Sequence, residues 1–466
     1  MRKKFLTALG NFIKRMLSFE LPLYFFASAI SLCIIAGLAF GFLVQRIERK
    51  GPESTYFGET IQSIAASPGA LVDAARTLRT AFQQVNPQVK GRFRLDHPDR
   101  FSRIVSVDSV PPLEGTRIHV TEAASPGWRI ITGFFDIDAE RMAAAILLDE
   151  AMQVVHVWRL HEEDVSHPEK RGRLFKFPHG FDVLPDGSIF YSFDGGVSLK
   201  RVDVHGRTSW YKPGRYHHAI TLGEEGKTLW TLRHAVGKRD RKAFDDMENR
   251  YLDQLDAETG KTLNTISLAD VIRANKKLSI LSTRPPSVHD PYHENDVDPL
   301  PPSLAEHFPQ FAPGDLLVSV RNANLVFVLE PRSQQVKWWR MGGVIYQHDP
   351  DWVADGSISI FDNSLDTGTS RIIAIDPKTM ATEVTVPGGE LNFYSRFRGK
   401  HQVLPDGSVL VSSALQGRVL EVSPDKEVVF ELVNFIEDET ERVLMVSEAK
   451  WVPPDFFSPE ALEVFE

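Results

Sequence analysis

The feature that most constrains the fold of this chain is a short unit that recurs along it. Each copy consists of a histidine, a short apolar stretch, a turn and a second apolar stretch. Three copies carry an Asp-Gly pair in the turn, which suits a hairpin because glycine adopts positive φ without a Cβ clash. These copies begin at His179, His348 and His401, and a degenerate copy begins at His218. Four copies of one unit predict a repeat fold, in which each unit buries its apolar face against the next.

From about residue 101 the chain has the pattern of an all-β array. Short runs rich in Val, Ile, Phe and Trp alternate with Gly, Pro and Asp turns, as around residues 154–158. Short strands at this spacing are typical of sandwiches and barrels, and the number of units predicts a six-bladed β-propeller over residues 101–466. Within it, we interpret the charged and proline-rich residues 238–313 as an insertion. The tail around Trp451 is expected to supply a strand that closes the ring, because a closed ring has no free edge.

The composition limits the partners and the covalent chemistry of the chain. It has 466 residues, of which 25% are charged, and a net charge of −9. This balance provides no basic field and argues against a nucleic-acid partner. Cys33 is the one cysteine in the sequence, so no disulfide can form within the chain. Cysteine usage therefore cannot indicate the redox compartment.

The N-terminal part of the sequence predicts a membrane anchor. Residues 1–20 are basic, and residues 21–44 contain no charged side chain. About 20 apolar residues in a helix span a bilayer, and this run is longer than the apolar core of a cleaved signal peptide. Residues 45–100 follow as a predicted helical stalk. The excess of positive charge before the apolar run predicts a single-pass inner-membrane protein with a cytoplasmic N-terminus and a periplasmic propeller.

The strand-leading histidines predict a shared site. The inner strands of a propeller run along its axis, so residues that begin them point into one mouth. If the four histidines occupy equivalent positions, their imidazoles converge, and such a cluster suits metal ligation, acid–base catalysis or anion binding. The alternative is that each is a turn residue bonded to backbone groups. His293 begins a fifth segment, which contains Asn295 and a later strand that ends at Arg321.

The order of several short motifs resembles the bacterial arylsulfate sulfotransferase family. The motifs that carry the resemblance are His293-x-Asn295, Leu317-x-Ser319-x-Arg321, Gln347-His348, Phe361-Asp362-Asn363 and Ser370-Arg371. The resemblance implies a six-bladed propeller that moves a sulfuryl group from an aryl sulfate to a phenol without PAPS. It implies a transiently sulfated histidine, no cofactor and no metal, with the aryl sulfate and the phenol as small-molecule partners.

The resemblance also implies roles for individual residues. An imidazole can attack sulfur and later leave, an arginine can bind a tetrahedral oxyanion through two hydrogen bonds, and a second imidazole can protonate the departing phenolate. Residues 412–417, where the family has its nucleophile, contain no histidine, so His401 is taken as the substitute. The residues expected to be catalytic are His293, His348, Arg371 and His401. The residues expected to bind substrate are His179, His218, Asn295 and Arg321.

Two other functions remain open on the sequence. The absence of histidine from residues 412–417, together with the predicted anchor, also fits a catalytically inactive, membrane-anchored propeller that acts as a binding scaffold. Channels lined by His and Asp also occur in metallo-hydrolases and quinone-dependent oxidoreductases. However, the sequence has no glycine-rich dinucleotide motif and no tight spacing of metal ligands.

Overall fold

The computed structural model describes residues 89–95, 97–161, 177–194, 198–235, 250–278, 292–436 and 441–465. The chain divides into two compact units, residues 1–85 and residues 86–466. The first unit lies outside the described residues, and so do the predicted basic tail, the apolar run and most of the stalk. The fold described below is that of the second unit.

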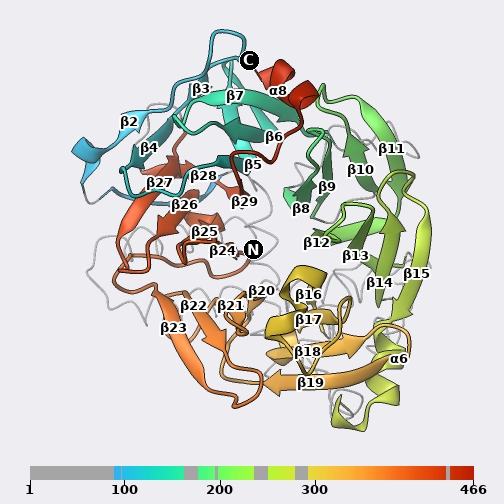
Figure 1. The fold of residues 1–466 in the computed structure, drawn as a ribbon. Coiled ribbons are helices and arrows are strands. Elements are labelled where there is room, and N and C mark those ends of the chain that lie inside the picture. The colour runs from blue at the N-terminus through green and yellow to red at the C-terminus, as the bar shows by residue number, and fades with distance from the viewer. Residues whose placement is uncertain are drawn as a thin grey trace, which may run out of the picture. The chain divides into compact units, whose positions relative to one another are not determined.

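Six β-sheets are arranged as blades around a common axis, with one strand of each next to the axis (Figure 1). The first blade contains, from the axis outward, β29 (Val446–Val452), β5 (Trp128–Ile137), β6 (Glu140–Leu148) and β7 (Val154–Arg159). The second contains β8 (Pro178–Val183), β9 (Ile189–Phe193), β10 (Ser198–Val202) and β11 (Thr208–Pro213). The third contains β12 (Arg215–Leu222), β13 (Thr228–His234), β14 (Arg250–Asp256) and β15 (Thr262–Ser267).

The other three blades follow the same order. The fourth contains β16 (Glu294–Pro299), β17 (Leu316–Val320), β18 (Leu325–Glu330) and β19 (Gln335–Met341). The fifth contains β20 (His348–Trp352), β21 (Ile358–Asp362), β22 (Arg371–Ile375) and β23 (Thr382–Pro387). The sixth contains β24 (Lys400–Val403), β25 (Val409–Ser413), β26 (Arg418–Val422) and β27 (Val428–Asn434). The predicted all-β, six-bladed propeller is confirmed.

The remaining described elements are short. β2 (Ser102–Arg103) and β4 (Thr116–Val120) extend the sixth blade, β3 (Leu113–Glu114) pairs with β5, and β1 (Val89–Arg92) pairs with β28 (Arg442–Leu444). The α-helices are α6 (Leu268–Ala274) and α8 (Pro459–Phe465). The 3₁₀ turns are η1 (Pro98–Arg100), η3 (Lys276–Leu278), η4 (Pro302–His307), η5 (Arg321–Ala323) and η6 (Ala414–Gln416).

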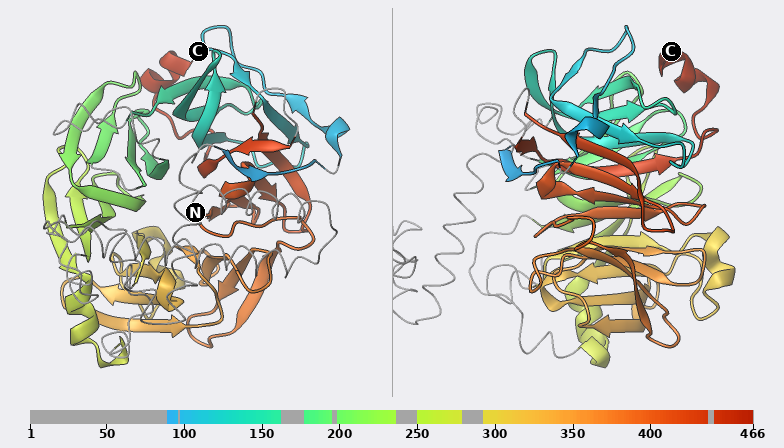
Figure 2. Two further views of the ribbon diagram at one scale, coloured as in Figure 1. Left: turned by 180° about the vertical axis from the view of Figure 1, so that it is seen from behind. Right: turned by 90° about the vertical axis from the view of Figure 1, so that its left-hand side faces the viewer.

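The two ends of the propeller unit close the ring at separate joins. The C-terminal strand β29, which contains Trp451, is the inner strand of the first blade and pairs antiparallel with β5. The N-terminal strand β4 pairs with β27 on the outer side of the sixth blade. The view from behind in Figure 2 shows these blue and red strands together. The tail around Trp451 therefore has the closing role expected from the sequence, and the ring leaves no unpaired edge at the join.

The apolar core lies between neighbouring blades and leaves the axis to polar side chains. Val318 and Phe327 of the fourth blade, for example, pack with Trp230 and Leu252 of the third, and all four are buried. Burial of this apolar area is the main stabilising term, at about 0.8 kcal/mol for each buried methylene group. Since the packing uses the faces of the sheets, the inner strands can present charged residues to the axis.

The stretch predicted as an insertion, residues 238–313, contains blade strands. β14 and β15 are the two outer strands of the third blade, and β16 is the inner strand of the fourth. Their alternating polar residues gave a weak strand pattern, and the prediction of an insertion over the whole stretch was wrong. Only α6 and the 3₁₀ turns η3 and η4 lie between strands in its described part.

The predicted localisation also needs correction. The described α-helices, α6 and α8, have seven residues each, which at about 1.5 Å per residue is far short of the roughly 30 Å of a hydrocarbon core. In the described part of the chain, no helix is long and apolar enough to cross a bilayer. This finding contradicts the prediction of a single-pass inner-membrane protein with a periplasmic propeller. Residues 21–44 themselves lie outside the described residues.

Candidate active site

The inner strands bend where they carry their histidines and other polar residues. Among the described strands, five of the six inner ones change register there, which is the mark of a β-bulge. The shifts fall at Pro178/Phe181 in β8, His217/Ile220 in β12, Glu294/Asp296 in β16, His348/Pro350 in β20 and Val446/Glu448 in β29. A bulge inserts one extra residue and turns its side chain away from the regular alternation. His218 and His293 also have positive φ, 69° and 50°, a conformation that costs about 1–3 kcal/mol and recurs at functional sites.

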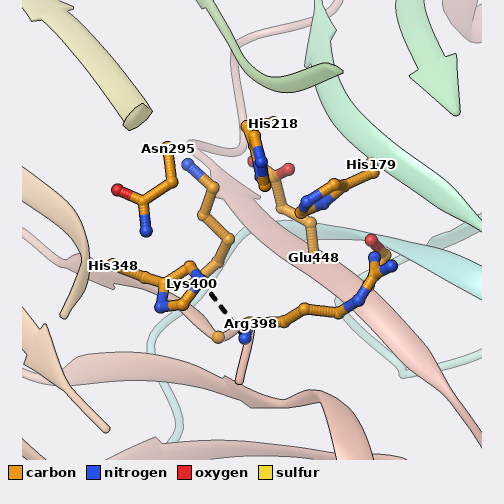
Figure 3. Close-up of a pocket in the computed structure, with 9 residues that line it drawn as sticks. His179, His218, Asn295, His348, Arg398, Lys400 and Glu448 are labelled. Carbon is orange, nitrogen blue, oxygen red and sulfur yellow. Dashed lines mark hydrogen bonds between the residues drawn. The ribbon is translucent and has the colours of Figure 1, made fainter. Parts of the chain in front are cut away.

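These bent strands surround a narrow polar pocket on the axis (Figure 3). Its lining comes from all six blades: His179, His218, Asn295, His348, Arg398, Gly399, Lys400, Ser447 and Glu448. The pocket has a volume of about 10 Å³, which is enough for about one water molecule. A larger group, such as a sulfuryl group, therefore requires side chains of the lining to move.

Imidazole rings pack against one another beside this pocket. The ring centres of His179 and His218 lie 4.2 Å apart, and those of His218 and His293 lie 4.9 Å apart. His217, the residue before His218, has its ring centre 3.9 Å from that of His234 on β13. His348 lies across the pocket from His179 and His218 in Figure 3. Four of the histidines that the sequence singled out thus come together, from four different blades.

The pocket keeps these imidazoles neutral. Burial lowers the pKa of His179, His218 and His348 well below the usual value for histidine. Nearby groups act in the same direction: Arg398 on His179, the neighbouring histidines on His218, and Arg321 on His348. A neutral imidazole has a lone pair on one ring nitrogen, so at neutral pH these rings can act as nucleophiles or hydrogen-bond acceptors.

The hydrogen bonds of His348 define which nitrogen carries that lone pair. Its Nδ1 lies 3.0 Å from the backbone oxygen of Tyr346 and 2.7 Å from Oδ1 of Asn363. The Tyr346 oxygen can only accept, so Nδ1 carries the hydrogen. The amide nitrogen of Asn363 donates to the carbonyls of Ser395 and Arg398, at 2.7 Å each, which orients Oδ1 toward His348. The lone pair of His348 is therefore on Nε2, where it accepts a hydrogen bond of 3.3 Å from the backbone N–H of Arg398 (dashed line in Figure 3).

Arg398 supplies a guanidinium to the same pocket. One end of the group donates through Nη2 to Asp194, and the guanidinium carbon lies 4.5 Å from the ring centre of Phe177. The side chain is buried, and within the described residues its Nη1 has no hydrogen-bond partner. Buried donors are normally bonded, since leaving one unpaired costs about 1–3 kcal/mol. Arg398 therefore has one end held and one end ready for an oxyanion.

A wider chamber adjoins the narrow pocket. It has a volume of about 800 Å³ and is lined by the later residues of the inner strands. Lys400 and Glu448 line both spaces. Lys400 donates to Asp296 at 2.7 Å and to Asp349 at 2.5 Å, and Lys450 donates to Asp182. Alternating acids and lysines thus neutralise part of the charge that the axis carries here.

One group in the wide chamber has the spacing of metal ligands. Ligand atoms of Asp349, Asp351 and His401 lie within 4.8 Å of one another. However, Asp349 already accepts hydrogen bonds from Lys400 and His401, and His401 Nε2 lies 2.7 Å from the hydroxyl of Ser359. The ammonium group of Lys400 already supplies a positive charge to the carboxylate of Asp349, so we assign no metal to this cluster.

Comparison with known proteins identifies the family. The family model described as arylsulfotransferase (ASST) matches residues 183–435, which is more than half of the chain and spans most of the blades that line the pocket. The chain belongs to the arylsulfotransferase family. Membership suggests an arylsulfotransferase-like function and hence a sulfotransferase activity. A search of curated proteins found no match.

Solved structures similar to this arylsulfotransferase family member are distant. A protein of unknown function from Bacteroides caccae is 10% identical, with 70% of this chain and 99% of that chain covered and a TM-score of 0.45. Virginiamycin B lyase from Staphylococcus aureus is also 10% identical, with 54% and 69% covered and a TM-score of 0.33. Neither likeness is close enough to bear on function.

Two of the residues predicted to be catalytic lie outside the narrow pocket of this member of the arylsulfotransferase family. Arg371 is on β22, away from the axis, where its Nε donates to Asp362 at 2.9 Å and its side chain is 39% exposed. His401 lines the wide chamber instead of the narrow pocket. Gly399, not His401, stands where other copies have histidine: it precedes Gly407 by the same spacing by which His348 precedes its own turn glycine. Both predicted placements were wrong.

The other predicted residues lie at or beside the pocket. Asn295 lines it and donates from its amide nitrogen to the backbone oxygen of Gln347 at 2.8 Å. Arg321 stacks on the ring of Tyr346, 5.0 Å from the ring centre, close enough to His348 to lower its pKa. Sequence reasoning missed Arg398 and Glu448. Aligning the copies on their turn glycines would have indicated Arg398, beside Gly399, but no repeat signal marks Glu448.

Proposed function

We propose that this arylsulfotransferase transfers a sulfuryl group from an aryl sulfate to a phenol, without PAPS, through a sulfated His348. The observation that supports this most directly is the hydrogen bonding of His348, with Nδ1–H held by Asn363 and Tyr346 and the Nε2 lone pair inside the pocket. In covalent catalysis, a second residue commonly orients the nucleophile, and further hydrogen bonds orient that second residue. Here Asn363 orients His348, and the carbonyls of Ser395 and Arg398 orient Asn363. The neutral state of the ring leaves a lone pair on Nε2. This lone pair can attack sulfur once it gives up the hydrogen bond that it accepts from the backbone N–H of Arg398.

The bonds exchanged follow from this assignment. In the first half, Nε2 of His348 attacks sulfur, and the bond from sulfur to the aryl oxygen breaks with its electron pair going to the phenolate. In the second half, the acceptor oxygen attacks the same sulfur, and the sulfur–nitrogen bond returns its pair to Nε2. Splitting one displacement into two lowers the barrier of each.

Arg398 and the facing histidines are suited to hold the sulfuryl oxygens. The Nη1 group of Arg398 has no partner in the described chain, and charged hydrogen bonds to an oxyanion are about twice as strong as neutral ones. His179 and His218, as neutral rings, add N–H donors without adding charge. One guanidinium with neutral donors matches the single negative charge of a sulfate ester.

The test uses the full-length chain with 4-nitrophenyl sulfate as donor and a phenol as acceptor. We expect transfer by the wild type and a loss of about 10³-fold or more for His348→Asn, because the covalent route is removed. Mass spectrometry of the enzyme after donor alone should find sulfate on the peptide that contains His348. His307→Asn, which removes a histidine on η4 that lines neither the narrow pocket nor the wide chamber, is the matched control and should retain activity. No transfer by the wild type, or sulfate on another histidine such as His401, would overturn the proposal.

A further inference from the structure

The proposed transfer leaves one requirement unassigned, a group that gives a proton to the departing phenolate and takes one from the acceptor. Phenols have a pKa of about 10, so an unprotonated phenolate is a poor leaving group. His179, His218 and His348 are neutral in the pocket, because burial lowers the pKa of each well below its usual value. They carry no imidazolium proton to give at neutral pH.

Glu448 is the one carboxyl side chain that lines the narrow pocket in the described part of the chain. It lies on β29, directly after the register shift of that strand, and it also faces the wide chamber. Figure 3 shows its side chain among those that line the pocket together with His179, His218 and Lys400. Glu448 therefore lines the narrow pocket that contains His348 and also faces the wide chamber.

The charged groups around Glu448 are paired with other residues. Those that face it are Lys400 on β24, Lys450 on β29 itself, Asp349 on β20 and Asp182 on β8. Lys400 donates to Asp296 and Asp349, and Lys450 donates to Asp182. Each lysine thus already has a carboxylate partner, and two of these partners, Asp349 and Asp182, also face Glu448.

Burial in this setting raises the pKa of Glu448 to about 8, against the opposing effect of Lys400 and Lys450. Below that pH the side chain is a neutral carboxylic acid with one transferable proton. A pKa near the working pH is what acid–base catalysis requires, since the group can then both give and accept the proton. The two lysines are placed to stabilise the carboxylate once the proton has left.

We propose that Glu448 is the acid–base residue of the transfer, passing its carboxyl proton to the leaving phenolate and recovering one from the acceptor phenol. This inference rests on the proposed function. In the first half the O–H bond of Glu448 breaks and an O–H bond forms on the donor phenol as its bond to sulfur breaks. In the second half the acceptor's O–H bond breaks toward the Glu448 carboxylate while its oxygen bonds to sulfur. The proton balance closes over one turnover, with no further reagent.

The experiment compares two donors in a single turnover of the full-length enzyme without acceptor. Phenyl sulfate has a poor leaving group that needs protonation, whereas 4-nitrophenyl sulfate has a good one that does not. For Glu448→Gln, which keeps the shape of the side chain, we expect a loss of about 100-fold or more with phenyl sulfate and less than about 5-fold with 4-nitrophenyl sulfate. The wild-type rate with phenyl sulfate should fall as the pH rises through about 8, and the variant's rate should not.

Asp298→Asn is the matched control. Asp298 is also an inner-strand residue whose carboxyl has a raised pKa, but it lines only the wide chamber and not the narrow pocket. This variant should keep both rates within about 3-fold, since the general-acid contribution of Glu448 remains. A purely structural role for Glu448 predicts equal losses with both donors and an unchanged pH profile, which would overturn the proton-transfer role while sulfated His348 still formed. If the wild type releases phenol from neither donor and forms no sulfohistidine, the proposed function fails as well.

Infrared difference spectroscopy provides a measurement that does not depend on turnover. The wild type minus Glu448→Gln spectrum at pH 7 should contain the carbonyl band of a protonated carboxyl, which disappears as the pH is raised above about 8. Glu448→Asp, which keeps the carboxyl, should retain part of the phenyl sulfate activity if Glu448→Gln is poorly folded. A carboxylate band at pH 7, or no rescue by Asp, would overturn the proposal.

Discussion

Arg398 and His348 come from neighbouring blades, and each is held at one end so that the other end faces the pocket. Asp194 and Phe177 hold the guanidinium of Arg398, and Asn363 and Tyr346 hold Nδ1 of His348. At the scale of single residues, this arrangement reduces the side-chain entropy that would be lost on binding. Groups fixed before the substrate arrives contribute more to affinity and rate than groups that must be ordered by it.

The role of Arg398 can be measured as binding of inorganic sulfate. We expect Arg398→Gln to weaken sulfate affinity by about 10- to 100-fold in calorimetry, since a hydrogen bond to a charged group contributes about 1.5–3 kcal/mol. Arg371→Gln is the matched control, because that side chain is on β22 and bonded to Asp362. It should leave the affinity unchanged. Equal weakening by both substitutions would mean that a general loss of positive charge, and not the pocket, determines sulfate binding.

At the scale of elements, the bulged inner strands determine where the polar side chains meet. In β8 the bulge includes His179 and Gly180, and Gly180 has φ of +119°. A Cβ at Gly180 would lie 2.5 Å from the backbone oxygen of His218. The strand can therefore pass close to β12 only because this residue has no side chain, and the approach brings the two histidines together.

Substitution of Gly180 tests the importance of that close approach. Gly180→Ala should lower the free energy of unfolding in urea by about 3 kcal/mol or more, through backbone strain and a clash with β12. Gly206→Ala is the control: its φ is also positive, at +75°, but a Cβ there meets nothing within 4 Å. It should cost about 1 kcal/mol, from the strain alone. Equal costs for the two variants would show that the contact between β8 and β12 is not tight.

At the scale of the whole molecule, ring closure gathers carboxyl groups from several blades into the wide chamber. Burial raises the pKa of Asp298 well above its usual value, and Asp296 and Asp349 act in the same direction while Lys400 and Lys450 oppose them. For an acid whose pKa is higher in the folded state, the folded chain holds the proton more tightly. Its contribution to stability is therefore present at low pH and lost as the pH rises from the unfolded value of 3.8 toward the folded one.

This linkage predicts the effect of removing the carboxyl. Between pH 5 and pH 7 the wild type should lose stability relative to Asp298→Asn by about 1 kcal/mol or more, since one pKa unit corresponds to about 1.4 kcal/mol. The measurement is urea unfolding of both proteins at the two pH values. Asp425→Asn, on an exposed turn of the sixth blade, should follow the wild type. If the free energy of unfolding changed with pH in Asp298→Asn as it does in the wild type, the raised pKa of Asp298 would be contradicted.

Much of the fold could be predicted because its signals are local. The alternation of short apolar strands with Asp-Gly turns is written into each unit, and so the all-β propeller, its six blades and its closing tail followed from the sequence. The outer strands β14 and β15 did not, because their many polar residues resemble those of a solvated insertion. For the site, His179, His218, His293 and His348 were found from their place at the start of inner strands.

The sequence by itself determined the family, the repeated unit and the histidines that begin its strands, because these depend on residue type and short spacing. Only the tertiary structure decided which polar groups share a pocket. Arg398 lies just before β24 and Glu448 lies on β29, and both line one pocket because the C-terminal strand β29 closes the ring as the inner strand of the first blade. His401 belongs to the right motif but lies in the wide chamber, because its register differs from that of the other copies. Bulges and ring closure set those positions, and both are properties of strands packed together.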